Sequence, residues 1–351
     1  MIHLIPTEAK RFRTFGWVQD PSDFRSLCDV VAIFDETSLK HQELAGQVIP
    51  ALVEERDGRQ RLLDALNQRP LRISYTDLVG TSFTPRSAAR CNGIVQAAVR
   101  GQVRPFIGDW PADNFVRWAH ALGFLRYGYQ GDAFELTETG KALAQARTQG
   151  EELNSQEKEL FTSAVLAYPP AVRILSLLGE GEGAHLTKFE LGKQLGFVGE
   201  DGFTSLPQTV LVRSLASSKD AKEKNKMKTD WDGSSDKYAR MNAKWLEKLG
   251  LVKQEAKPVK VTLAGRKYTE SIGQSYVITG LGITALNRTL GKSRHKRIPK
   301  TVSFEMMATK GDDREYLRTR RTCVLKAVSE GKGSVSCNEI HKNLEALGLK
   351  K

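Results

Sequence analysis

The feature that most restricts the fold of this chain is a short repeat in which a tryptophan precedes a glycine by five residues. W-A-H-A-L-G-F-L begins at Trp118, and W-L-E-K-L-G-L-V begins at Trp245. Glycine is the residue that most readily closes a helix, so each copy predicts a helix that ends near its glycine. A weaker copy, L-E-A-L-G-L, begins at Leu344. The repeat indicates that one supersecondary unit is used more than once.

The first copy predicts a helix followed by a two-stranded wing. The helix is expected from Asp113 to Leu122, closed by Gly123, with strands at 124–127 and 134–137. The following L-T-E-T-G has two candidate counterparts after the second copy, V-T-L-A-G at 261–265 and I-T-G-L-G at 278–282. The sequence leaves both open, and the second would mean a longer wing. This layout is typical of a winged helix.

The second copy lies in a helix whose N-terminal end is basic. Ser234 or Ser235 is expected to cap it, and Gly250 to close it. An apolar stripe faces the core (Met241, Trp245 and Leu249). Lys237 and Arg240 lie three apart on another face, with the carboxylate of Asp232 just ahead. Such a helix is typical of one that enters the DNA major groove, although a solvated charged face is the alternative.

A lysine-rich segment, Ser217 to Thr229, precedes this helix and is expected to be a loop that meets phosphates or merely aids solubility. The segment Ala51 to Leu66 predicts a helix that Gly58 interrupts. The net charge of +12 and pI of about 9.5 favour a polyanionic partner.

The composition limits the cellular compartment in which the protein works and the class of protein to which it belongs. The four cysteines contain no C-x-x-C, and 40% of the residues are hydrophobic. We therefore expect a protein of the reducing cytoplasm, with no zinc finger, disulfide framework, secretion signal or membrane span. The fold class is expected to be mainly α with small β wings, as tandem winged-helix/helix-turn-helix subdomains. The expected divisions are 1–166, 167–290 with its major-groove helix at 235–249, and 291–351, a basic linker plus an incomplete third unit.

A search for catalytic chemistry finds little. Metal-dependent nucleases commonly need Pro-Asp followed by Asp/Glu-x-Lys, and the chain has no Pro-Asp. Two three-residue matches to the second half, at 8–10 and 255–257, have no partner. P-loop, H-E-x-x-H and G-x-S-x-G motifs are also missing. His120 is interpreted as a packing residue. We therefore expect neither a catalytic nor a metal site in this chain.

A set of longer segments runs in order along nearly the whole chain. They are R-T-F-G-W-V-Q at 13–19, L-V-G-T at 78–81, R-W-A-H-A-L-G-F at 117–124, Y-P-P-A-V-R-I-L at 168–175, L-T-K-F-E-L-G-K at 186–193, G-F-T-S-L-P at 202–207, W-D-G-S-S-D-K-Y-A-R-M at 231–241 and Y-L-R-T-R-R at 316–321. On these segments the chain resembles the N-terminal DNA-recognition region of the FokI-like type IIS restriction endonucleases.

The resemblance implies three subdomains with winged-helix cores, of which the first two read a short asymmetric site, GGATG. It also implies that cleavage belongs to a separate Mg²⁺-dependent domain missing from this chain, or supplied in trans by another. Any enzymatic activity of the chain alone is therefore uncertain, and it is expected to bind double-stranded DNA as a monomer without a cofactor.

The resemblance also implies the DNA-contacting residues: Gln19, Asp20, Arg86, Gln102, Trp110, Thr229, Asp232, Lys237 and Arg240. Lys237 and Arg240 match the family pattern, and either can donate to guanine O6 or N7. Asp20 and Thr229 replace asparagines of the family, and Asp232 replaces a glutamate. These changes put the site itself in question, because an aspartate can only accept hydrogen bonds. Two alternatives remain, a winged-helix transcriptional regulator and a complete endonuclease with an unrecognised active site.

Overall fold

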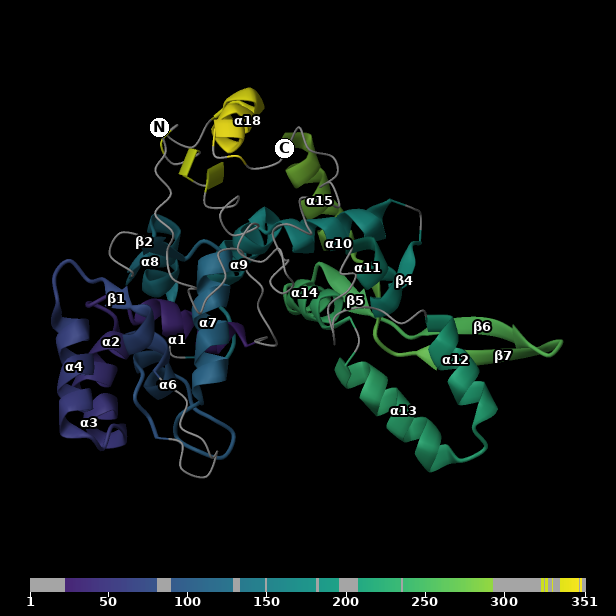
Figure 1. The fold of residues 1–351 in the computed structure, drawn as a ribbon, viewed down its shortest axis with the longest axis horizontal. Helices are drawn as coiled ribbons and strands as arrows, with labels where there is room; N and C mark the ends of the chain where they lie inside the picture. The colour runs from purple at the N-terminus through teal and green to yellow at the C-terminus, as the bar shows by residue number, and fades with distance from the viewer. Residues whose placement is uncertain are drawn as a thin grey trace.

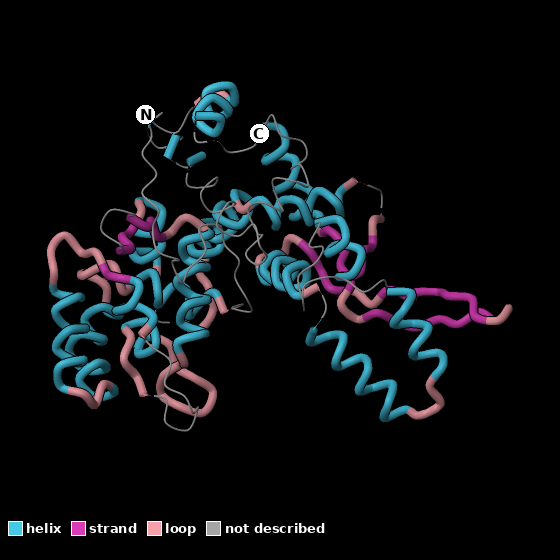
Figure 2. The backbone as a smooth tube through the Cα atoms, viewed as in Figure 1, coloured by secondary structure: helices cyan, strands magenta, loops and turns pink. Residues whose placement is uncertain are grey.

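The computed structural model describes residues 23–80, 90–128, 133–148, 150–180, 183–195, 208–234 and 236–292, with 323–324, 326–327, 330, 335–346 and 348. Over these residues the chain is mostly helical and carries small antiparallel sheets (Figures 1 and 2). The expected fold class is confirmed.

The chain enters the described region through a group of helices. They are α1 (Phe24–Ala32), α2 (Leu39–Glu43), a π-helical turn (Leu44–Val48), α3 (Ile49–Leu52) and α4 (Arg56–Asn67). The break expected at Gly58 lies earlier, because Val53 and Glu55 are extended and Glu55 is the N-cap of α4. Gly58 lies inside the first turn of α4.

The first copy of the repeat folds as β1 (Ile73–Ser74), α5 (Tyr75–Val79), α6 (Ile94–Ala98), α7 (Asp109–Ala121), β2 (Leu125–Gly128), β3 (Ala133–Leu136) and α8 (Glu138–Ala146). These elements are called the first repeat. Its strands are ordered β1-β3-β2, with Tyr127 opposite Phe134. Helix α7 begins four residues before the predicted Asp113, because Pro111 falls in its first turn, where a missing N–H costs little.

The second copy folds as β4 (His185–Thr187), α11 (Lys188–Leu195), α12 (Gln208–Ser217), α13 (Ala221–Ser234), α14 (Lys237–Lys248), β5 (Val252–Gln254), β6 (Lys257–Leu263), β7 (Arg266–Ile272), β8 (Ser275–Ile278) and α15 (Gly280–Lys292). These elements are called the second repeat. The strand order β4-β8-β5 matches that of the first repeat, and the hairpin β6–β7 is inserted between β5 and β8.

Equivalent hydrogen bonds settle which segment is the counterpart of L-T-E-T-G. In the first repeat Thr137 Oγ1 donates to Phe124 O at 3.1 Å and accepts from Gly140 N at 3.0 Å. In the second, Thr279 Oγ1 donates to Leu251 O at 3.0 Å and accepts from Gly282 N at 3.0 Å. The I-T-G-L-G segment is therefore the counterpart, and the wing is the longer one.

The prediction that the lysine-rich segment 217–229 forms a loop is wrong. Most of that segment is the start of α13, and only 218–220 separate it from α12. Lysine, alanine, glutamate and methionine are all good helix formers. Met227 and Trp231 pack, one turn apart, against a small core of α12 and the β6–β7 hairpin that includes Leu215 and Val261. Tertiary packing thus stabilises a segment whose charges suggested a loop.

The two repeats share one hydrophobic core. Helices α9 (Ser155–Ala167) and α10 (Pro169–Gly179) run between them, with α9 packed on α8 and α10 on α14 (Figure 1). Trp118 and Trp245, the tryptophans of the sequence repeat, stack with ring centroids 4.9 Å apart. No single described helix is long and apolar enough to cross a membrane, although the bent pair α9 and α10 meets that test when taken together.

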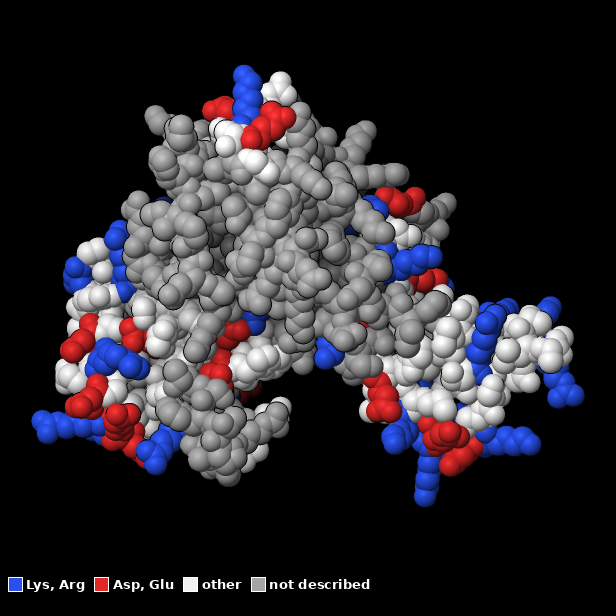
Figure 3. Space-filling model, in the orientation of Figure 1, with Lys and Arg blue, Asp and Glu red and all other residues white. Residues whose placement is uncertain are grey.

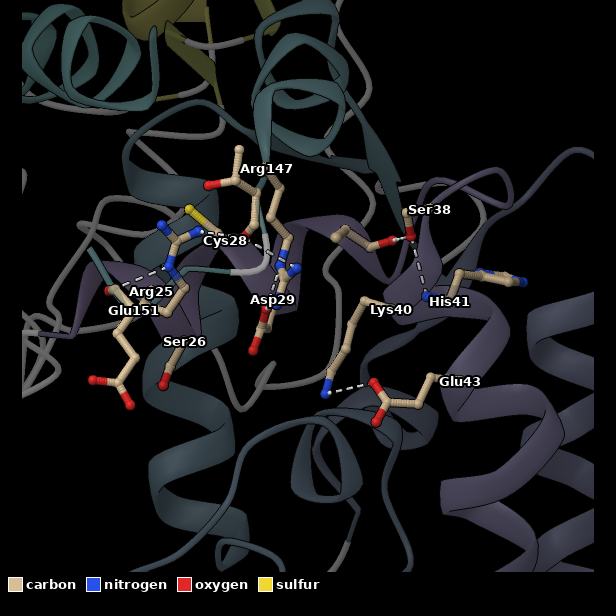
Figure 4. Close-up of polar contacts among 12 residues, drawn as sticks. Arg25, Ser26, Cys28, Asp29, Ser38, Lys40, His41, Glu43, Arg147 and Glu151 are labelled. Carbon is tan, nitrogen blue, oxygen red and sulfur yellow. Dashed lines mark hydrogen bonds and ion pairs between the residues drawn. The ribbon is translucent and has the colours of Figure 1, made fainter. Parts of the chain in front are cut away.

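Ion pairs of charged side chains connect α1 to the end of α8 and to α9. Arg25, Asp29 and Arg147 are labelled in Figure 4. Arg25 donates to both carboxylate oxygens of the buried Glu157, at 2.6 and 3.0 Å, and Arg147 pairs with Asp29 at 2.5 Å. Glu157 also closes a capping box with Asn154 at the start of α9. Burial by itself would raise the pKa of Glu157, but the hydrogen bonds from Arg25 and the Asn154 N–H outweigh it and lower that pKa.

The end of the third copy has the same turn as the other two. Gly348 has φ +68°, and its N–H donates to Glu345 O at 2.9 Å. Gly123, with φ +77°, donates in the same way to His120 O at 3.0 Å. The repeat predicted that a glycine closes each helix, and a left-handed glycine after the last turn is the usual form of that closure. The preceding helix is α18 (Cys337–Ala346).

Candidate nucleic-acid interface

Helix α14 begins at an unusual buried N-cap. Its N-cap is Asp236 and not the expected Ser234, which is the last residue of α13, and the other expected cap, Ser235, lies outside the described residues. Asp236 is fully buried with φ +49°, a left-handed conformation that aspartate tolerates better than most residues. A Cβ on Gly192 would lie 1.8 Å from Asp236 Oδ1, so only glycine leaves room for this carboxylate. The expected helix 235–249 is therefore shorter, Lys237–Lys248.

The two faces of α14 are sharply different. Tyr238, Met241 and Trp245 are buried, as the apolar stripe predicted. On the opposite face Lys237 and Arg240 are half-buried and Lys244 is exposed, at i, i+3 and i+7. The structure thus brings Lys237 and Arg240 onto one face and adds Lys244, which the sequence analysis missed and which its helical spacing could have revealed.

Helix α7 presents a different chemistry at the matching positions of the first repeat. Aligning Trp118 with Trp245 pairs Trp110 with Lys237, so both predicted site residues occupy the first turn of equivalent helices. The indole of Trp110 is 51% exposed. One turn further on, Asp113 accepts from Tyr75 Oη at 2.8 Å and pairs with Arg117. The first repeat therefore offers an aromatic group where the second offers a cation.

Gln102 lies in the loop that leads into α7, and its side chain is exposed. The loop is closely packed, because a Cβ on Gly101 would lie 2.5 Å from Phe106 O. Its far end is tied down by a hydrogen bond of 3.2 Å from Ile107 N to Gln96 O. Gln102 therefore lies in the loop ahead of α7, and Trp110 lies in the first turn of that helix.

Thr229 is exposed on α13, and Asp232 lies in the last turn of the same helix rather than in a loop ahead of α14. The Thr229 hydroxyl donates to Asn225 O at 2.9 Å within the helix. The fully buried Lys188 donates its Nζ to Trp231 O at 2.7 Å and so fixes the α13 end that carries Asp232. Thr229 and Asp232 therefore both lie in the last two turns of α13, the helix that precedes α14.

A second polar cluster holds α11 and the hairpin together. Glu190 accepts from Lys257 Nζ at 2.8 and 3.0 Å and from Thr187 N at 2.8 Å, while Thr187 Oγ1 accepts from Glu190 N at 3.2 Å and caps α11. Burial alone would raise the pKa of Glu190, but the hydrogen bonds from Lys257 and Thr187 lower it. These contacts connect α11 to the first strand of the hairpin, β6.

The remaining predicted residues Gln19, Asp20 and Arg86 lie outside the described residues, as does the side chain of Asp232. His120 Nδ1 donates to Leu125 O at 3.0 Å, and the imidazole ring meets the Phe134 ring edge-on. This agrees with its interpretation as a packing residue. Within the described part of the chain no three His, Cys, Asp or Glu side chains gather as a possible metal site.

Comparison with known proteins identifies this arrangement. Family models for FokI match in order: recognition domain subdomain 1 over residues 13–146, recognition domain subdomain 2 over 157–294, and the D3 domain over 307–351. The type II restriction enzyme FokI of Planomicrobium okeanokoites is 44% identical over 97% of this chain and 58% of its own length. The type II restriction enzyme StsI of Streptococcus sanguinis is 33% identical over 93% of this chain and 54% of its own.

Solved structures agree. The structure of restriction endonuclease FokI has a TM-score of 0.76 at 42% identity, covering 96% of this chain and 57% of that one. The structure of FokI bound to DNA has a TM-score of 0.78 at 43% identity, covering 97% and 58%. The chain thus spans somewhat more than half the length of these relatives. With all three subdomains matched in order, the chain belongs to the family of the FokI recognition domains.

Proposed function

We propose that this chain binds double-stranded DNA at a short asymmetric sequence, GGATG or a close variant, as the recognition part of a type IIS restriction endonuclease. The observation that carries the proposal is the cationic face of α14, formed by Lys237, Arg240 and Lys244, in a family with a structure solved bound to DNA. Arginine and lysine are the side chains that most often read guanine from the major groove.

The two repeats suit an asymmetric target. Their equivalent helix entrances carry different groups, Trp110 in α7 and Lys237 in α14. Identical readers would favour a symmetric or repeated site, whereas different readers favour a non-palindromic one. One copy of the chain therefore suffices to read the site, and we propose that it binds as a monomer. Cleavage, with its Mg²⁺ requirement, is proposed to belong to a nuclease domain outside this chain, joined to it or supplied in trans.

The test is a fluorescence-anisotropy titration of a labelled GGATG duplex and a scrambled duplex at one stated salt concentration. We expect a preference of roughly a thousandfold or more for GGATG, the usual range of specific over non-specific binding. Lys237→Ala and Arg240→Ala should each lower the preference for guanine by about 1–3 kcal/mol, or about 5- to 150-fold.

Lys253→Ala is the matched control, because Lys253 is exposed on β5 and pairs with Glu255 at 2.9 Å. The Lys253→Ala variant should prefer the GGATG duplex over the scrambled duplex by the same factor as the unchanged chain. Equal binding of both duplexes by the unchanged chain would rule out GGATG as the site. Selection from random duplexes would then show whether Asp20, Thr229 and Asp232 have altered the target or whether the chain has no preferred sequence.

A further inference from the structure

Helix α13 separates its side chains into two faces. Met227 and Trp231 pack into the small core beside α12 and the hairpin, and Trp231 meets Phe189 edge-on at 5.9 Å. Lys228 turns toward the hairpin and pairs with Glu270 at 3.1 Å. The helix is therefore docked along one side, and Lys188 holds its C-terminal end at Trp231 O.

The opposite face is exposed and basic. Lys222, Asn225, Lys226 and Thr229 are all exposed and follow one another at spacings of three, one and three residues, which places them on one side of the helix. Among the residues that the structure describes, no carboxylate pairs with Lys222 or Lys226. In Figure 3, Lys and Arg side chains project from the lower edge of the lobe formed by α12, α13 and the hairpin, with acidic side chains among them.

The geometry of this face suits a DNA strand. Lys226 lies four residues after Lys222, which corresponds to about 6 Å of helix rise. Two base steps along one DNA strand rise by about 7 Å. The two ammonium groups can therefore reach phosphates of the same strand without any change in the docked helix. Thr229, on the same face, places this line directly beside the proposed base-reading end of α13 and α14.

We propose that Lys222 and Lys226, with Asn225 between them, bind the phosphates of one DNA strand beside the recognised bases. This contact rests on the proposed function and deepens it. It supplies affinity and holds α13 in register, but carries no sequence information, because every base step offers the same phosphates. The alternative, a merely solvated face, predicts no specific contribution to binding.

The test compares two charge-matched double variants. Lys222→Gln with Lys226→Gln removes the proposed contact. The control, Lys260→Gln with Lys267→Gln, removes the same charge from exposed positions on the hairpin face that points away from α12 and α13. Affinity for the GGATG and scrambled duplexes is measured over a range of salt concentrations, and denaturation midpoints verify that both variants fold.

The α13 variant should reduce the slope of log K against log salt by about 0.9 for each lysine, or about 2 in total. At 0.15 M salt this corresponds to roughly thirtyfold weaker binding of both duplexes, with their ratio unchanged. A slope equal to that of the unchanged chain, or equal to that of the hairpin control, overturns the proposal. If the unchanged chain binds both duplexes equally, the proposal that GGATG is its site is wrong. The difference in salt slope between the two double variants still tests whether Lys222 and Lys226 bind phosphates.

Discussion

Trp118 and Trp245 should couple the stability of the two repeats. Both indoles are fully buried, and their rings stack at 4.9 Å with an interplanar angle of 23°. Phe24 flanks Trp118 at 5.1 Å, and Tyr168 flanks Trp245 at 5.8 Å. Either tryptophan replaced by alanine leaves a cavity in a core shared by both repeats. We expect each substitution to cost about 3–5 kcal/mol of the free energy of unfolding.

The two costs should not add. Aromatic pairs contribute about 0.5–1.5 kcal/mol beyond the area they bury. Once the first indole is removed, the second has lost that contribution already. The double variant should therefore be less destabilised than the sum of the single variants by about that amount, which a double-mutant cycle measures. Phenylalanine replacements keep part of the stack and provide a cycle with smaller losses if the alanine variants do not fold.

The assay is equilibrium unfolding in urea, followed by tryptophan fluorescence and by far-ultraviolet circular dichroism. A shared core predicts coincident transitions for the two signals, and a lower midpoint for the whole transition in each single variant. Strict additivity, or a variant in which only one of two separate transitions moves, would refute the coupling of the repeats through this pair.

Two further predictions concern the repeated turn and the α1 clamp. Gly140→Ala and Gly282→Ala should each destabilise the fold by about 1–3 kcal/mol, because a Cβ would lie 2.1 Å from Phe124 O and 2.0 Å from Leu251 O. Gly46→Ala, with open space around it, is the control for thermal denaturation. Equal midpoints for all three variants would contradict the predicted clash at the turns, and unequal losses at Gly140 and Gly282 would contradict the equivalence of the two turns. Glu157→Gln should cost about 3 kcal/mol or more at pH 7 by leaving Arg25 without its carboxylate. Because the folded-state pKa of Glu157 lies below its unfolded value, the stability from this group is present above about pH 4.3 and is lost as the pH falls through the lower folded value. The variant should therefore show a flatter loss of stability below pH 5 in urea titrations, and an acid limb as steep as that of the unchanged chain would rule out Glu157 as its source.

Local patterns in the sequence predicted the elements around each repeated glycine. The helix, left-handed glycine and first strand at 118–127 depend on residues close in sequence, so spacing alone suffices to predict them. The apolar stripe of α14 and the cap of α11 by Thr187 follow from the same local chemistry. Among the proposed site residues, Lys237 and Arg240 could be placed on one face from their spacing.

Long-range contacts decided the features that were missed. The third strand of the first sheet, β1, has two residues and exists because Ile73 pairs with Phe134. The N-cap of α14 moved to Asp236 because Gly192, from α11, makes room for its carboxylate. The local sequence could identify neither Phe134 as the strand partner of Ile73 nor Gly192 as the neighbour of Asp236.

The sequence by itself determined the repeated helix-and-strand unit and the net positive charge of the chain. Both depend only on residue types and short spacings. Only the tertiary structure decided that 221–234 is a helix, since Met227 and Trp231 are stabilised there by a hairpin that follows some thirty residues later. The tertiary structure also decided which of the two segments, 261–265 or 278–282, follows the wing of the second repeat. Thr262 and Thr279 are the same residue type in similar segments, but only Thr279 reaches the carbonyls of 250 and 251, and that proximity depends on the folded path of the chain.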